Sequence, residues 1–240
     1  MSYYELLLQI NNKVKENIEM LNNSGKINEL SACVSFITDI EAWLACCGEF
    51  AIHPLVTAAL TECSNSIFLC AQGFYKEAFV ALRQTLEHFL FALLLSTNDF
   101  NYRLWKKEQY GMSWKQITDE ENGVFSKKFI SLYSDDCLTE KSLEMITIVK
   151  NVYRDCSEFV HGNHQKLSIL ANDLNYKENM LEYYVSSFKS VEYILCMALL
   201  IRFYDIFTIQ ENIQKLETII YERLGNIPVI LELSIKTNEV

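Results

Sequence analysis

Proline occurs at only two of the 240 positions, Pro54 and Pro228, and glycine at only seven. Proline ends or kinks helices and glycine is common in turns, so their scarcity permits long uninterrupted helices. A fold with many strands needs more turn residues than this chain contains. Half of the residues are apolar and 22% are charged, which is typical of an ordered globular protein. The sequence therefore predicts an all-α fold.

Apolar residues recur at helical spacing in long segments that end at glycine or at small polar residues. Pro54 suits the first turn of one segment, and Thr139 stands where the cap of another is expected. Between residues 98 and 136 the pattern breaks into short pieces containing Gly111 and Gly123, which predicts an insertion of short helices. The expected long helices span residues 2–21, 27–47, 54–72, 75–96, 139–161 and 177–209, followed by an amphipathic stretch at 212–224.

These segments predict one domain over residues 1–240, built as a bundle of about six long helices. Its core is expected at about residues 55–210, with the helices of residues 2–48 packed on it. The longest apolar runs, 89–95 and 193–201, are shorter than the ~20 residues of a membrane span, and we interpret them as core segments. The N-terminus lacks a basic region followed by a cleavable apolar stretch, so we expect a cytoplasmic protein.

Two bulk features limit the chemistry that is expected of the chain. The eight cysteines form no CxxC pair and lie in apolar helical stretches, so they are expected to be reduced and buried. The net charge of −10 argues against broad electrostatic binding to nucleic acid or to an anionic membrane, because such binding needs many cationic contacts. A small, local phosphate site is still compatible with this charge.

The end of the expected helix 139–161 carries a line of polar residues. At ~100° per residue, Arg154 and His161 are about 20° apart on one face, with Ser157 and Glu158 between them. Arg offers a cationic fork for phosphate oxygens. His has a pKa near neutrality, and a neighbouring Glu can fix the tautomer of its imidazole ring. The alternative interpretation is an i, i+4 surface ion pair of Arg154 and Glu158, with His161 favoured at a helix end by the helix dipole.

This line resembles the signature of the HEPN superfamily of helical domains. Arg154 is followed by the polar Asp155, six residues separate Arg154 from His161, and Gly162 follows the histidine. The resemblance implies a helical bundle that forms a homodimer in which two copies of the motif face one cleft. It also implies a metal-independent endoribonuclease that acts as a toxin or phage-defence effector on RNA, with a possible cognate antitoxin or defence-system partner.

In such an enzyme the ribose 2′-hydroxyl attacks its own phosphate. His161 would be the general base or acid and Arg154 would neutralise the developing charge, supported by Asp155, Ser157 and Glu158. No cofactor or metal is expected: His161, His164 and Cys156 match no standard zinc pattern. Some members of the superfamily are inactive, so the alternative is a non-catalytic helical sensor or interaction module that partners another defence protein. A purely structural oligomerisation role is a third possibility.

Two further groups of residues have both a structural and a functional interpretation. Arg83 and Glu87 share one face of the expected helix 75–96, either as a structural pair or as residues that position Arg154 or His161. In the insertion, aromatic and cationic residues alternate, which is typical of a grip on single-stranded RNA by stacking and phosphate contacts. Alternatively, the tryptophans anchor the insertion to the core. The candidates for RNA binding are Arg103, Trp105, Lys106, Lys107 and Trp114.

Overall fold

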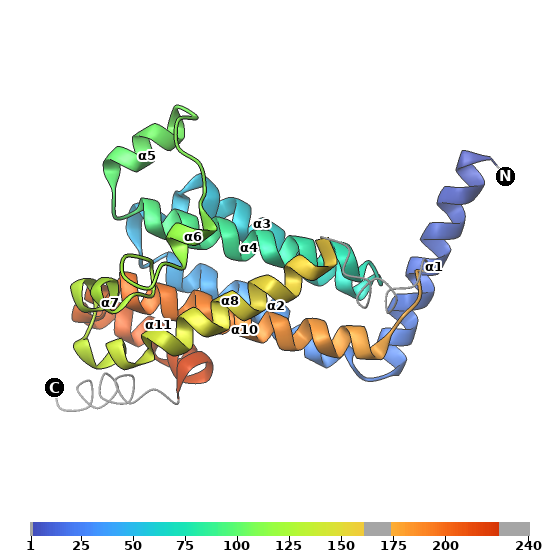
Figure 1. Ribbon diagram of the computed structural model, residues 1–240. Coiled ribbons are helices and arrows are strands. Elements are labelled where there is room, and N and C mark those ends of the chain that lie inside the picture. Colours follow the sequence, from blue (N-terminus) through green and yellow to red (C-terminus); the bar gives the residue numbers. More distant parts are fainter. Residues whose placement is uncertain (1, 161–173, 226–240) are drawn as a thin grey trace.

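The computed structural model describes residues 2–160 and 174–225, and within these ranges every regular element is helical (Figure 1). The all-α prediction is confirmed. The long helices are α1 Tyr3–Asn23, α2 Ile27–Leu44, α3 Pro54–Ala71, α4 Tyr75–Leu95, α8 Ser142–Val160, α10 Glu178–Arg202 and α11 Gln210–Leu224. The predicted insertion contains the short helices α5 Asp99–Lys106, α6 Trp114–Ile117 and α7 Lys127–Tyr133, and 3-10 turns span Gly48–Ile52, Asp136–Lys141 and Tyr204–Thr208.

Helices α4 and α10 lie at the centre of the bundle, because both are apolar on almost every side. From Phe89 to Leu95 only Leu94 of α4 is not buried, and α10 is buried continuously from Ile194 to Ile201. A helix that is apolar all round needs neighbours on every face. Helices α3, α8 and α10 pack against α4, and α2 packs against α3 and α10 (Figure 1).

The two ends of α4 are held by different partners, which fixes its direction in the bundle. Near its start, the rings of Phe79 and Phe159 stack with centroids 4.2 Å apart, so the end of α8 lies beside the beginning of α4. Near its end, Arg202 of α10 donates hydrogen bonds to the Ser96 side chain and carbonyl, both at 3.0 Å. Further along α4, Arg83 meets Tyr153, which comes earlier in α8 than Phe159, so α4 and α8 are antiparallel. Helix α5 follows at the opposite end of α4 from the end of α8.

The start of α8 differs from the expectation that Thr139 caps it. The Thr139 hydroxyl donates to the Asp136 carbonyl inside a 3-10 turn, and α8 begins only at Ser142. The Asp135 side chain caps the 3-10 turn instead, accepting from the backbone N–H of Cys137. The prediction of the Thr139 cap was wrong because the polar residues ahead of the apolar run form their own turn.

Within the part of the chain that the structure describes, helix α1 is attached to the bundle by its second half only. Asn17 is fully buried: its side-chain nitrogen donates to the carbonyls of Gln72 and Leu174, and its side-chain oxygen accepts from the Tyr176 N–H. A side chain at Gly73 would meet this amide, since an added Cβ would lie 2.6 Å from the Asn17 nitrogen. The first half of α1 extends away from the bundle (Figure 1).

The structure changes two expectations about apolar residues. By length and composition alone, α3, α4 and α10 are apolar enough to cross a membrane. In the most apolar 18-residue stretch of each helix, 67% of α4 and 72% of α10 is buried inside the protein, against 33% of α3. The sequence expectation counted only uninterrupted runs, which underestimates apolar helices that contain a few polar residues. All eight cysteines lie in the described ranges as thiols, but Cys137 is exposed and Cys46 is only partly buried.

Candidate functional site: the α4–α8 face

Arg154 lies on the outer face of α8. Its side chain is 66% exposed, and its guanidinium donates to the Asn151 side chain at 3.2 Å and lies 4.0 Å from the Asp155 carboxylate. These neighbours belong to the same helix, so the guanidinium is held loosely and is accessible to a ligand. His161, the predicted catalytic partner, lies outside the described residues, as does His164.

The other members of the predicted polar line are less exposed than Arg154. Ser157 and Glu158 are both partly buried, and the Ser157 hydroxyl donates to the Tyr153 carbonyl at 2.6 Å. Phe159, in contrast, is 1% exposed in the core. The described part of the line therefore runs along the edge between the core and the solvent.

Arg83 and Glu87 form the predicted ion pair on α4, and the pair faces α8. The Arg83 guanidinium lies 2.9 Å from the Glu87 carboxylate, and the two side chains are 19% and 11% exposed. Arg83 also donates to the Tyr153 hydroxyl at 2.7 Å and stacks over the Tyr153 ring, 4.6 Å from its centroid. Through Tyr153 the pair reaches the residue next to Arg154 rather than Arg154 itself.

Tyr153 is the residue of this site that the sequence did not single out. Trp114 of α6 stacks on its ring with centroids 3.9 Å apart, so the ring is held between the Trp114 indole and the Arg83 guanidinium. Burial raises the pKa of Tyr153, and its hydrogen bond to Glu87 adds to the effect. No local pattern in the sequence marks Tyr153, because its contacts with Arg83 and Trp114 depend on how α4 and α6 pack against α8.

The candidates for RNA binding in the insertion are divided between two places. Trp114 lies at the α4–α8 face. Trp105 stacks on His53 and Tyr102, with centroids 5.4 and 6.0 Å apart, so both tryptophans pack against the rest of the protein as anchors. The three cations are exposed on or just after α5: Arg103 pairs with Asp99, Lys106 lies over the Tyr102 ring, and Lys107 follows the last turn.

The cations of α5 are far from the end of α8. Tyr153, which precedes Arg154, contacts Arg83 of α4, and the 12 residue steps from Arg83 to Leu95 at the end of α4 correspond to roughly 18 Å at 1.5 Å per residue. Within one chain, therefore, Arg154 does not share a phosphate with Arg103, Lys106 or Lys107. Only an RNA that extends over several nucleotides reaches both.

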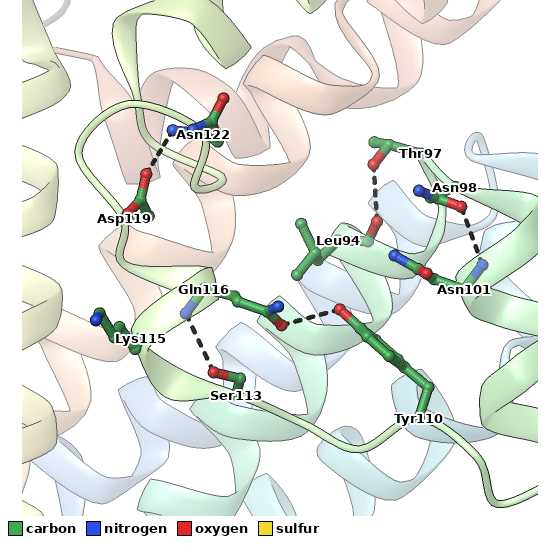
Figure 2. A pocket seen from close by; sticks show the side chains of 10 residues that line it. All are labelled: Leu94, Thr97, Asn98, Asn101, Tyr110, Ser113, Lys115, Gln116, Asp119 and Asn122. Carbon is green, nitrogen blue, oxygen red and sulfur yellow. Dashed lines mark hydrogen bonds between the residues drawn. The ribbon is translucent and has the colours of Figure 1, made fainter.

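A polar pocket lies between the end of α4 and the α6 region (Figure 2). Its volume of about 680 Å³ suits a small organic ligand. The Tyr110 hydroxyl donates to the Gln116 side chain at 2.9 Å, and Asp119 accepts from the N–H of Asn122, which lowers the pKa of this carboxyl. Lys115 is the only cation among the lining residues, which are Leu94, Thr97, Asn98, Asn101, Tyr110, Ser113, Lys115, Gln116, Asp119 and Asn122.

No group of three or more His, Cys, Asp or Glu side chains suited to a metal ion occurs in residues 2–160 or 174–225. The chemistry available at the α4–α8 face is that of an accessible guanidinium and a rigid Arg–Glu–Tyr cluster. These features define an all-helical bundle protein with a candidate anion site at the end of one core-facing helix. No protein-family model matches the chain, and neither a curated protein nor a solved structure was found to be similar to it.

Proposed function

We propose that this protein is a metal-independent endoribonuclease of the HEPN type, with Arg154 and His161 in its active site. The observation that carries the proposal is the exposed Arg154 guanidinium on the last turns of α8, seven residues before His161. The α8 backbone at this point is fixed to α4 through Tyr153, so a phosphate bound by Arg154 meets a preorganised helix.

The proposed reaction is attack of a ribose 2′-oxygen on the adjacent phosphorus. His161 takes the 2′-hydroxyl proton, the P–O5′ bond breaks, and the products are a 2′,3′-cyclic phosphate and a 5′-hydroxyl that regains a proton. General acid–base help contributes about 10² to 10⁴ in rate, so one histidine alone makes a weak nuclease. Arg154 supplies a comparable share by stabilising charge on the phosphorane. Asp155, Ser157 and Glu158 support these two residues.

The biological part of the proposal follows the same resemblance. The protein acts in the cytoplasm as a toxin or phage-defence effector, works as a homodimer on an RNA substrate, and is controlled by a cognate antitoxin or defence-system protein. Arg83 and Glu87 are positioning residues, because they act on α8 through Tyr153. The cations of α5 contact a distant part of the RNA chain.

The test is cleavage of end-labelled RNA in EDTA by the unmodified protein and by His161→Ala and Arg154→Ala. We expect a cyclic-phosphate product from the unmodified protein and a loss of at least about 100-fold in rate in each variant, of similar size in both. The matched control is Lys150→Ala, which removes an exposed cation one turn earlier on α8. Equal cleavage by all four proteins would contradict the proposal.

A second candidate function is a non-catalytic interaction module for another defence protein. The observation that favours it is the exposed apolar surface of α1, where Tyr3 and Tyr4 are 76% and 69% exposed. Such surfaces mark sites of association in soluble proteins. The absence of cleavage in the assay above, together with retention of a partner that α1 variants lose, would favour this candidate.

A further inference from the structure

The apolar residues of α1 form one continuous stripe. Tyr3, Leu7, Ile10 and Val14 follow one another at spacings of four, three and four residues, which places them on one face of the helix. The stripe continues to Leu21, which is 2% exposed against the bundle. Thus the second half of α1 buries this face against its own chain. In the described structure, nothing covers the same face in the first half.

The first half of α1 is a regular helix despite its exposure. Ser2 and Glu5 form a capping box: the Ser2 hydroxyl accepts from the Glu5 N–H, and the Glu5 carboxylate accepts from the Ser2 N–H at 2.6 Å. Nevertheless Leu7 is 46% and Ile10 is 40% exposed. The packed second half of α1 nucleates the helix, so the first half can extend from it, but its apolar face stays in water and a partner that covers this face would stabilise it.

An apolar groove opens beside the second half of α1, between α1, α2 and α3. Its volume is about 450 Å³ and almost all of its lining is apolar. Four of its lining residues are also exposed: Ile18 is 39%, Ile27 36%, Val34 54% and Phe68 63% exposed. Among residues 2–160 and 174–225, therefore, nothing covers this helix face or the groove directly next to it.

We propose that the first half of α1 docks in the groove of a second copy of this chain, and that the two α1 helices run antiparallel about a two-fold axis. In this arrangement each first half lies beside the second half of the partner's α1, which is where the partner's groove begins. The contact is isologous, so both helix faces and both grooves are covered at once. The proposal names an interface for the homodimer of the proposed function, but its test is the oligomeric state and does not depend on ribonuclease activity.

The surface available matches a dimer. The stripe and the exposed groove residues comprise eight apolar side chains, of which the aromatic Tyr3 and Phe68 can each bury on the order of 150 Å². A standard stable interface buries about 800 Å² per partner, so these side chains supply a large part of one. A lipid surface fits less well. Helix α1 carries three carboxylates and only two lysines, whereas helices that lie on membranes are rich in basic residues.

The test compares two leucines of equal exposure on different faces of α1. Leu7 is on the stripe and is 46% exposed, while Leu8 points away from it and is 43% exposed. Sedimentation of the full chain is expected to show a dimer that Leu7→Glu dissociates, with a Kd at least about 100-fold higher because the change occurs twice per interface. Leu8→Glu is expected to leave the dimer intact. Circular dichroism and Tm confirm that both variants are folded.

The groove is tested separately with a photo-crosslinking amino acid at Val34. We expect an intermolecular crosslink to the tryptic peptide that ends at Lys13, and its loss in Leu7→Glu. A monomer at all concentrations, a dimer that Leu7→Glu does not weaken, or a crosslink to another region each overturns the proposal. So does a monomer that binds neutral lipid vesicles through Leu7, because α1 would then be a membrane contact.

Discussion

At the level of single residues, Arg83 makes three contacts at once, and these explain how its charge is accommodated in the partly buried contact between α4 and α8. It pairs with Glu87, donates to the Tyr153 hydroxyl and stacks on the Tyr153 ring. Its spacing from Glu87 predicted the ion pair, because residues four apart on a helix are neighbours. The contact with Tyr153 depends on how α4 packs on α8, and no local pattern in the sequence carries that information.

Removing parts of this cluster is expected to give graded losses of stability. Tyr153→Phe deletes the hydrogen bonds of the hydroxyl to the charged groups of Arg83 and Glu87 and costs about 1.5 to 3 kcal/mol. Arg83→Met leaves Glu87 largely buried without its cation and costs more, roughly 3 kcal/mol. Urea unfolding measures both, with Lys150→Ala as an exposed control. If Arg83→Met costs no more than that control, the cluster does not stabilise the α4–α8 contact.

At the level of elements, His53 caps the start of α3, which begins at Pro54. The His53 backbone is extended, its Nδ1 accepts from the Leu55 N–H at 3.2 Å, and Pro54 occupies the first turn. The sequence predicted this start because the backbone N–H groups of the first turn have no partner within the helix, so proline, which lacks an N–H, fits there. The Thr139 cap was predicted by the same kind of rule and was wrong, since a 3-10 turn intervenes. Sequence patterns for helix caps give candidate helix starts, and the packing of the chain decides which of these starts are used.

The His53 cap should make α3 sensitive to acid. Burial lowers the pKa of His53, with a contribution from Lys106. A folded pKa below the unfolded value of about 6.5 means that the unfolded state takes up the proton first as pH falls. The His53 cap therefore stabilises the folded state above about pH 6.5, and this stabilisation is lost as the pH falls below that value. A helix cap is worth about 0.5 to 2 kcal/mol.

Substitution His53→Asn keeps a capping side chain and removes the titration. We expect the free energy of unfolding of this variant to fall less than that of the unmodified protein between pH 7 and pH 5.5 in urea titrations. Parallel pH profiles for the two proteins would show that the cap does not titrate in this range.

At the level of the whole molecule, the class of fold was predictable and the grouping of candidate residues was not. Scarce proline and glycine, together with helical periodicity, were enough for the all-α class and for most helix positions. The candidates were grouped by chemistry along the chain, yet Arg103 and Arg154 lie toward opposite ends of α4. Which residues meet depends on the direction of each helix in the bundle, and this is set by long-range packing.

The burial of Asn17 has a consequence for synthesis on the ribosome. This side chain needs Gln72, Leu174 and Tyr176, which are 55, 157 and 159 residues away. At about 5 to 20 residues per second, α1 emerges roughly 10 to 30 seconds before its last partner exists. Ribosome-bound chains halted before residue 174 should therefore leave α1 open to protease, and chains extended past α10 should protect its second half. Protection in both would mean that α1 docks without this amide. Otherwise the first helix to be made waits for more than 150 residues of later synthesis before it is fixed to the bundle.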